Sequence, residues 1–286
     1  MIKRNLLIAI LISCSIGIIK GQTISDSLAI VSARWKVESP QKGIIHKYAS
    51  IPRLYQGTQS VSLIEVDPGT GLNVDIAVSS EMKETSRIAS EHRAIAAING
   101  SYFDMKRGNS VCFLKVGNQV VDTTTLSECK LRVTGAMHMY KGKIKLIPWS
   151  RQIEKEYKGE AGTVLASGPL MLKDGQVCDW SSCGMNFIRT KHPRSAVATT
   201  KDGKVLLITV DGRFPKQAGG VNIPELAHLI RVLGGEDALN LDGGGSTTLW
   251  LSGASDDGVV NYPCDNGQFD HAGERKVPNI LYIMYP

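Results

Sequence analysis

Three short segments place acidic side chains beside glycines, a combination that can hold and transform a phosphorylated ligand. They are Asn-Gly-Ser-Tyr-Phe-Asp at 99–104, Asp-Gly-Arg at 211–213 and Asn-Leu-Asp-Gly-Gly-Gly-Ser-Thr-Thr at 240–248. Glycines let the backbone approach a ligand closely, and consecutive N–H groups can surround a phosphate. The carboxylates could act as acid, base, nucleophile or metal ligand. One Asp-Gly or Asn-Gly alone would more often be an ordinary turn.

Asp242 is the first of three candidate catalytic carboxylates. It ends an apolar strand pattern at 238–242, where an unpaired carboxylate would be costly, and it precedes three consecutive glycines. Those glycines cost roughly 0.5–1 kcal/mol each relative to alanine in regular structure, and a simple turn needs only one or two. We therefore expect Asp242 to be functional, with Asp211 and Asp104 as the other candidates.

Arginines supply the matching positive charge. Arg194, in the segment His192-Pro193-Arg194, and Arg213 are the expected phosphate ligands, because a guanidinium group matches the oxygens of a phosphate. Arg275 is a further candidate near the last strand. The other histidines show no spacing typical of a metal site; they are His46, His92, His138, His228 and His271.

Strand patterns lead into each of these motifs. Apolar strands are expected at 94–98, 204–210 and 238–242, directly before the three segments. Asp202-Gly203 predicts a hairpin between 195–200 and 204–210. A second hairpin is expected between 61–66 and 74–78.

Helices are expected at 81–92, from Ser150 to Tyr157, and at 224–233, the last with proline in its first turn and glycine at its end. These patterns predict an α+β (mixed α/β) fold, a single domain with a large, mostly antiparallel sheet and a few packed helices. The predicted organisation is a signal peptide at 1–21, an N-terminal arm at 22–59 and one domain at 60–286.

The N-terminus has the pattern of a secretory signal peptide. Lys3 and Arg4 precede an apolar run at 6–19, which is shorter than the roughly 20 residues of a membrane span. Cleavage after Gly21 would give an exported protein, periplasmic or secreted, whose mature chain has no transmembrane helix. The alternative is a lipoprotein anchored through Cys14.

Composition sets limits on the partners. The chain has 286 residues with a net charge of +6, and the predicted signal carries three of those positive charges, which leaves +3. This small excess, without a basic and aromatic stretch, argues against a nucleic-acid partner. The oligomeric state is not encoded in any pattern that we recognise.

Cysteines suggest a local cross-link. An exported chain meets an oxidising compartment. Cys178 and Cys183, which have four residues between them, are therefore expected to form a disulfide. Cys112 with Cys129 is a second possible pair. An odd number of cysteines after the signal leaves at least one free thiol.

Six motifs, occurring in this order, make residues 60–286 resemble the phosphodiester glycosidase family. They are Asn-Gly-Ser-Tyr-Phe at 99–103, Ser-Gly-Pro at 167–169, His-Pro-Arg-Ser-Ala at 192–196, Thr-Val-Asp-Gly-Arg at 209–213, the 240–248 segment, and Val-Pro-Asn at 277–279. Ser195 stands where this family more often has threonine.

The resemblance implies hydrolysis of a sugar-1-phosphodiester at the anomeric bond, with a phosphorylated carbohydrate as substrate and no required cofactor. Arg194, Arg213 and the amides at 243–246 would hold the phosphate, and Asp242 or Asp211 would be nucleophile or base, with Asp104 third. The motif residues complete the expected substrate-binding set: Asn99, Ser167, Gly168, His192, Arg194, Arg213, Asn240, Gly243, Gly244, Gly245, Ser246, Thr247, Arg275 and Asn279.

Two other functions remain open at this point. In a metal-dependent phosphodiesterase, Asp104, Asp211 and Asp242 would ligate Ca²⁺ or Mg²⁺. A non-catalytic glycan-binding protein would present exposed aromatic rings, but none of the four tryptophans lies in the glycine-rich motifs.

Overall fold

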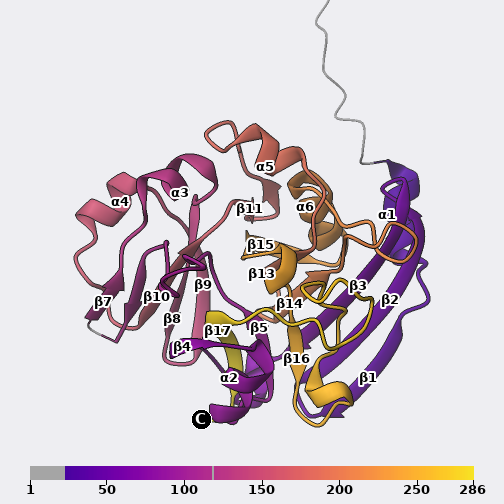
Figure 1. The fold of residues 1–286 in the computed structure, drawn as a ribbon, viewed down its shortest axis with the longest axis horizontal. Helices are drawn as coiled ribbons and strands as arrows, with labels where there is room; N and C mark the ends of the chain where they lie inside the picture. Colours follow the sequence, from indigo (N-terminus) through magenta and orange to yellow (C-terminus); the bar gives the residue numbers. More distant parts are fainter. Residues whose placement is uncertain (1–22, 118) are drawn as a thin grey trace, which may run out of the picture.

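Three antiparallel sheets form the framework in the computed structural model, which describes residues 23–117 and 119–286 (Figure 1). The largest sheet has eight strands. Their order across the sheet is β1 (Lys36–Gln41), β2 (Ile44–Leu54), β3 (Gly57–Val66), β14 (Val205–Val210), β13 (Arg194–Thr200), β15 (Gly235–Asn240), β11 (Leu170–Lys173) and β12 (Gln176–Val177).

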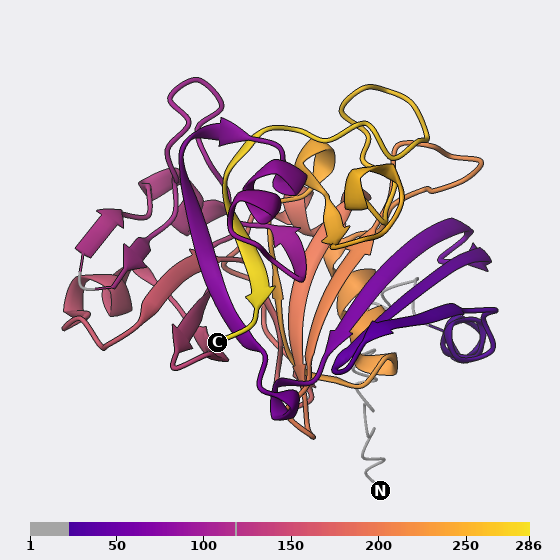
Figure 2. The ribbon, with the colours of Figure 1, turned by 90° about the horizontal axis from the view of Figure 1, so that it is seen from below.

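The two smaller sheets contain the remaining strands. The five-stranded sheet has the order β7 (Gln119–Asp122), β6 (Leu114–Val116), β10 (Thr163–Ser167), β8 (Gly135–Tyr140) and β9 (Lys143–Pro148). The four-stranded sheet has the order β16 (Leu249–Leu251), β5 (Ala96–Asn99), β17 (Val277–Met284) and β4 (Asn73–Lys83). Figure 2 shows the yellow strand β17 beside the long purple strand β4, to which it pairs.

Six α-helices lie among the described residues, all of them short. They are α1 (Ile24–Val31), α2 (Thr85–Glu91), α3 (Leu126–Leu131), α4 (Arg151–Glu156), α5 (Met185–Arg189) and α6 (Ile223–Val232). The predicted fold class, a mixed fold with a large antiparallel sheet and a few packed helices, is confirmed.

The eight-stranded sheet is buried on both faces. Along β14, Val205 and Leu207 point into the core that the three sheets share, whereas Leu206 and Ile208 point to the opposite face. This alternation follows from the two-residue period of a strand. The second face is covered by helices, for example through Leu226 of α6. Apolar residues on both faces explain why β14 reads as an uninterrupted hydrophobic run.

Several local predictions are confirmed. Asp202 and Gly203 lie in the turn between β13 and β14, which pair along their whole length. Helix α6 begins at Asn222, whose side chain accepts a hydrogen bond from the N–H of Glu225 at 2.9 Å. Ser150 caps α4 in the same manner, through the N–H of Ile153. The helix expected at 81–92 is shorter, because β4 extends to Lys83.

The hairpin predicted between 61–66 and 74–78 is wrong. β3 pairs with β2 and β14, and β4 pairs with β17 in a different sheet. The intervening residues Pro68–Thr70 form a short 3₁₀ helix, which Asp67 caps by accepting a hydrogen bond from the N–H of Gly69. The chain thereby passes from one sheet to another instead of turning back on itself.

Residues expected to form an N-terminal arm contribute α1, β1, β2 and the start of β3, so this segment is part of the eight-stranded sheet. The domain boundary at residue 60 stays a prediction. The expected signal peptide and Cys14 lie outside the described residues. Within the described part of the chain, no helix combines the length and apolar character that a bilayer crossing requires.

The expected disulfide between Cys178 and Cys183 is not present, and neither is one between Cys112 and Cys129. All five described cysteines are free thiols. Cys178 packs against the core between the sheets, whereas Cys183 is buried with the helices on the other face of the eight-stranded sheet. Sequence proximity therefore did not bring the two sulfur atoms together.

We expect thiol titration of the unfolded, unreduced protein from residue 22 onward to give five free thiols per chain. The measurement is reaction with a chromogenic disulfide reagent in guanidinium chloride. A matched sample reduced beforehand should give the same value. Three thiols before reduction and five after it would show that a disulfide forms in spite of the separation seen here.

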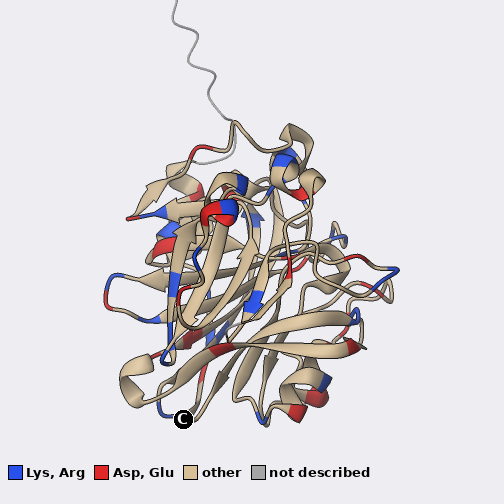
Figure 3. Cartoon of the chain, turned by 90° about the vertical axis from the view of Figure 1, so that its left-hand side faces the viewer, with Lys and Arg blue, Asp and Glu red and all other residues tan. Residues whose placement is uncertain are grey.

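Charges of both signs are interspersed on the elements that face the viewer in Figure 3. Many are paired across strands. Lys47 and Lys204, for example, both contact Glu65, with nitrogen–oxygen distances of 3.0 and 2.7 Å.

Candidate active site

Asp242 lies where β15 ends and the three glycines begin. Its backbone N–H donates to the carbonyl of Gly100 at 3.0 Å, and its carbonyl accepts from the side chain of Asn99 at 2.7 Å. Its carboxylate accepts from the N–H of Gly243 at 2.9 Å, and the residue as a whole is half-buried. The motif at 99–103 therefore fixes the backbone that carries this carboxylate.

Asn99 joins three of the sequence motifs. Its side-chain oxygen accepts a hydrogen bond from the Ser195 hydroxyl at 2.6 Å and from the N–H of Thr248 at 3.2 Å. Asn99, Ser195 and Thr248 are all buried. The resemblance had placed Asn99 in the substrate-binding set, but its visible role is to hold the Asp242 turn against β13 and β5.

A second buried network of hydrogen bonds surrounds Asn240, just before the Asp242 turn. The Tyr102 hydroxyl donates to the Gly168 carbonyl at 2.6 Å and accepts from the Asn240 side chain at 2.8 Å. The Ser167 hydroxyl donates to the Asn240 carbonyl at 2.9 Å. Ser167 and Gly168, predicted to contact substrate, thus position Asn240, which precedes Asp242 by two residues. Tyr102 was not in the predicted set.

Five polar atoms around this turn are buried without a hydrogen-bond partner. They are the side-chain oxygen of Asn240, the side-chain nitrogen of Asn279 and the hydroxyls of Ser246, Thr247 and Thr248. Asn279 uses its oxygen to accept from the N–H of Ser101 at 3.0 Å. Because buried polar groups are normally satisfied, such a concentration is typical of a site that binds water or a ligand.

The three glycines are required by close packing. A Cβ atom on Gly243 would lie 2.5 Å from the carbonyl oxygen of Pro193, and one on Gly245 would collide with the side chains of Asp265 and Arg275. Gly244 has a φ of +62°, in the left-handed region that favours glycine. The prediction that this triplet serves more than a simple turn agrees with these contacts.

The amides of this turn are mostly used within the protein. The N–H of Gly243 donates to Asp242, that of Gly244 to the carbonyl of Pro193, and that of Ser246 to the carbonyl of Gly243. The sequence had suggested that the amides at 243–246 hold a phosphate. Three of these four amides already have partners in the protein, so phosphate binding through them stays a prediction.

Arg194 is buried, with only 2% of its surface exposed. Its guanidinium group donates to three backbone carbonyls, those of Val221 at 3.2 Å, Phe187 at 3.0 Å and Thr190 at 2.9 Å. Among the described residues it has no carboxylate partner. Burial lowers the pKa of Arg194 to about 10, which expresses the cost of keeping this charge away from water.

Arg132 lies near Arg194 and was not among the candidate site residues predicted from the sequence. Its guanidinium group binds both oxygens of Glu128, at 2.6 and 2.9 Å, and lies 3.5 Å above the ring of Tyr102. Arg132 and Arg194 both lie over the ring of Phe187, at 5.2 and 4.7 Å. In sequence, Glu128 and Arg132 look like an ordinary helical ion pair, so only the fold reveals this position.

Arg213 and Arg275 lie beside the glycines. Arg213 donates to the sulfur of Cys264 at 3.6 Å, and that thiol donates to the carbonyl of Gly244 at 3.6 Å. Arg275 contacts Asp265 at 3.0 and 2.5 Å. Cys264 and Asp265 were also missed, because the loop that contains them shows no recognisable motif.

The pKa of Asp242 depends on its burial and on the charges of nearby arginines. Burial raises the pKa of its carboxyl, while the neighbouring Ser246 hydroxyl, the Arg132 charge, the Gly243 N–H and the Arg275 charge oppose that rise. His192 lies close to both Arg194 and Arg213, and its pKa is lowered by burial first and then by these two charges.

Asp211 is placed differently. It is fully buried, and its carboxylate accepts from the Ser60 hydroxyl at 2.6 Å, the Asn261 side chain at 2.9 Å and the Tyr262 N–H at 3.0 Å. Burial raises the pKa of Asp211 to about 6, against the effect of these three donors. The carboxylate thereby joins β3 to the loop that begins at Asn261.

Asp104 also has local partners. One carboxylate oxygen accepts from the N–H groups of Lys106 at 2.8 Å and Arg107 at 3.2 Å. These two bonds hold the pKa of Asp104 below its usual range. Within residues 23–117 and 119–286, no group of three or more histidine, cysteine or acidic side chains is arranged to hold a metal ion. Asp104, Asp211 and Asp242 therefore do not form the carboxylate cluster that a metal-dependent mechanism would use.

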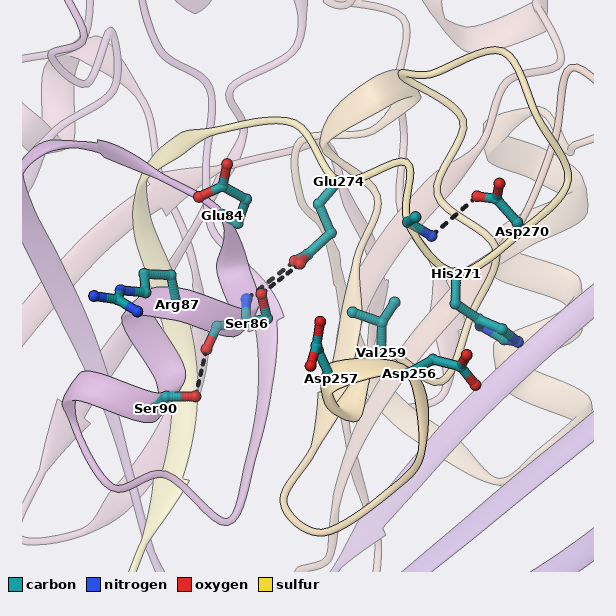
Figure 4. A pocket seen from close by; sticks show the side chains of 11 residues that line it. Glu84, Ser86, Arg87, Ser90, Asp256, Asp257, Val259, Asp270, His271 and Glu274 are labelled. Carbon is teal, nitrogen blue, oxygen red and sulfur yellow. Dashed lines mark hydrogen bonds between the residues drawn. The ribbon is translucent and has the colours of Figure 1, made fainter.

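A hollow of about 740 Å³ lies elsewhere, between α2, the segment Asp256–Gly258 and residues 270–274 (Figure 4). Glu274 points across it and accepts hydrogen bonds from the N–H and hydroxyl of Ser86, at 3.0 and 2.5 Å. This contact stabilises the first turn of α2. None of the residues that line the hollow belongs to the Asp242 turn.

Residues 92–284 match the family model described as phosphodiester glycosidase. The chain belongs to this family.

The relatives it matches are much longer. One is N-acetylglucosamine-1-phosphodiester alpha-N-acetylglucosaminidase of Mus musculus, 34% identical over 82 residues, which are 29% of this chain and 15% of the relative. Another is the prophage-derived uncharacterized protein YomE of Bacillus subtilis, 27% identical over 214 residues, which are 70% of this chain and 29% of YomE. The chain thus spans less than a third of either relative.

Two solved structures share the fold. The zebrafish N-acetylglucosamine-1-phosphodiester alpha-N-acetylglucosaminidase catalytic domain, auto-inhibited by its pro-peptide, has a TM-score of 0.67 at 17% identity and covers 91% of this chain and 93% of that one. A hypothetical protein from Synechocystis has a TM-score of 0.62 at 16% identity, and the match covers 88% of this chain and 64% of that one. At these identities the likeness establishes the fold alone.

Proposed function

We propose that this protein hydrolyses a sugar-1-phosphodiester at the anomeric carbon–oxygen bond, with Asp242 as the carboxylate that acts in the chemical step. The observation that carries the proposal is the placement of Asp242, half-buried and near the charges of Arg132 and Arg275, among five buried polar atoms without a partner. Asp104 instead interacts with the backbone and charges of its own loop, and Asp211 is fully buried among three donors. Family membership supports the same reaction class.

The arginines suit the leaving group of this reaction. When the anomeric bond breaks, the phosphate keeps both bonding electrons, and water supplies the hydroxyl of the free sugar and one proton. Arg194 lies in a poorly solvated position, where its attraction for the leaving phosphate is screened little. Asp242 can stabilise the positive charge that develops on the sugar ring, or attack it, from close by.

Hydrolysis in water labelled with ¹⁸O tests the reaction directly. We expect a panel of sugar-1-phosphodiesters to include substrates that yield free sugar and a phosphomonoester. The label should appear in the sugar and not in the phosphate. Label in the phosphate would show attack at phosphorus, and the protein would then be a phosphodiesterase. No turnover of any member of a broad panel would contradict the proposal as well.

We also propose that the protein is exported, because the basic and apolar pattern at 3–19 is typical of a signal peptide. Mass spectrometry of the protein made in its natural host should find Gln22, or a residue near it, at the mature N-terminus. A lipid-modified Cys14 would instead show that the chain is a lipoprotein. An intact Met1 would contradict export by either route.

A further inference from the structure

Two pairs of arginines lie on different sides of the Asp242 turn. Arg132 and Arg194 share the ring of Phe187 and lie on the Tyr102 side; we call them the inner pair. Arg213 and Arg275 lie against the glycines with Cys264 and Asp265; we call them the outer pair. In Figure 1, the magenta region with α3 lies to the left of β15, and the yellow loops near the end of the chain lie to the right.

Each pair contains one arginine that a carboxylate already neutralises. Arg132 binds Glu128 in the inner pair, and Arg275 binds Asp265 in the outer pair. In the described part of the chain, neither Arg194 nor Arg213 has an ion-pair partner. Each side of Asp242 thus presents one positive charge that the protein itself leaves unpaired.

The two unpaired charges differ in their surroundings. Arg194 is 2% exposed, and a buried charge without a counter-ion is costly unless a ligand supplies one. Arg213 is exposed, and its φ of +70° is uncommon for a residue with a side chain. That backbone places its guanidinium group about 3.0 Å from where a Cβ of Gly244 would be. Arg213 is therefore held beside the turn and does not extend freely into water.

We propose that the substrate carries two negatively charged groups, with its phosphodiester at the inner pair and a second phosphate or carboxylate at the outer pair. This rests on the proposed function and specifies its substrate class: an acidic sugar phosphodiester. The inner pair takes the reacting phosphate, because a poorly solvated charge stabilises the leaving group most. The outer pair is more exposed and recognises the second anion without taking part in the chemical step.

Three sugar phosphates test this by binding alone, independently of turnover. The probes are glucose 1-phosphate, glucose 1,6-bisphosphate and glucuronic acid 1-phosphate, compared by calorimetry at low ionic strength. We expect at least one of the two probes with a second anion to bind at least tenfold more tightly than glucose 1-phosphate. Whichever one does so identifies the second group as phosphate or carboxylate. Equal affinities for all three would overturn the proposal.

Two matched variants assign the pairs. Arg213→Met should reduce the affinity ratio between the two-anion probe and glucose 1-phosphate to nearly one. Arg132→Met should weaken all three probes by a similar factor and leave the ratio unchanged. A ratio that survives Arg213→Met would overturn the assignment of the outer pair. If the ¹⁸O label does not appear in the sugar but the affinity ratios are as expected, the proposed reaction is wrong and the two-anion site is still supported.

Discussion

Asp242→Asn should lower kcat by roughly 10²–10⁴-fold, the range associated with loss of a catalytic acid or base. Asparagine keeps the size of the side chain and an oxygen that can accept from the N–H of Gly243, so the turn should persist. The charge and basicity that act on the sugar are lost. Binding of glucose 1-phosphate should change little, because the arginines remain. Turnover and melting temperature should be measured on the same preparation.

Asp104→Asn is the matched control for this experiment. It makes the same chemical change at the candidate whose carboxylate binds the backbone of Lys106 and Arg107. We expect it to keep most of the activity. An active Asp242→Asn protein with a lowered melting temperature would instead mean that Asp242 only stabilises the turn. Loss of activity in the Asp104 variant would return that residue to the catalytic set.

Asp211→Asn should mainly destabilise the protein, by about 1–3 kcal/mol. Three donors converge on this buried carboxylate, from Ser60, Asn261 and Tyr262. An amide oxygen can still accept from Asn261 and Tyr262, but the NH₂ group then faces the Ser60 hydroxyl, which must turn to accept and loses the bond it donates to the carboxylate. Denaturant unfolding followed by fluorescence measures the change. A variant with normal stability and no activity would show instead that Asp211 acts in catalysis.

The same residue predicts a dependence of stability on pH. Its folded pKa of about 6 lies above the ordinary value of 3.8, so the folded protein binds this proton at pH values where the unfolded chain does not. Asp211 therefore contributes stability that is fully present below about pH 4 and is lost as the pH rises through 6. The difference in unfolding free energy between wild type and Asp211→Asn should accordingly shrink as the pH rises from 4.5 to 6.5. A difference that grows over this range would contradict the raised pKa.

Elements that depend on nearby residues could be predicted from the sequence. Asp202-Gly203 specifies a tight turn between β13 and β14, and Asn222 with Glu225 specifies the start of α6. Pairing between distant strands could not be predicted in this way. The alternating pattern at 61–66 fits any antiparallel partner with an apolar face, and it pairs with 205–210, not with the nearer strand at 74–78.

The site shows the same limit. The position of Asp242 follows from its own segment, because the strand pattern and the glycines are adjacent to it. The contribution of Arg132 depends on Tyr102 and Phe187, which come from separate parts of the chain. Asp211 shows the same limit, since its Asp-Gly-Arg segment made it the second candidate, and nothing in the sequence indicates the three donors that converge on its carboxylate.

The position of β17 has a consequence for how the protein is made. This strand is interior to its sheet, where it pairs with β5 and β4 and joins Met284 to Asn73. Such distant pairings make folding slow, because a long loop must close before any contact forms. At typical synthesis rates, the roughly 200 residues between these strands take on the order of 10–40 s to emerge. Until β17 has been synthesised, the N–H groups of Gly100 and Ser101 lack the acceptors that Asn279 provides. The segment that positions Asp242 is therefore incompletely held on the nascent chain until β17 is in place.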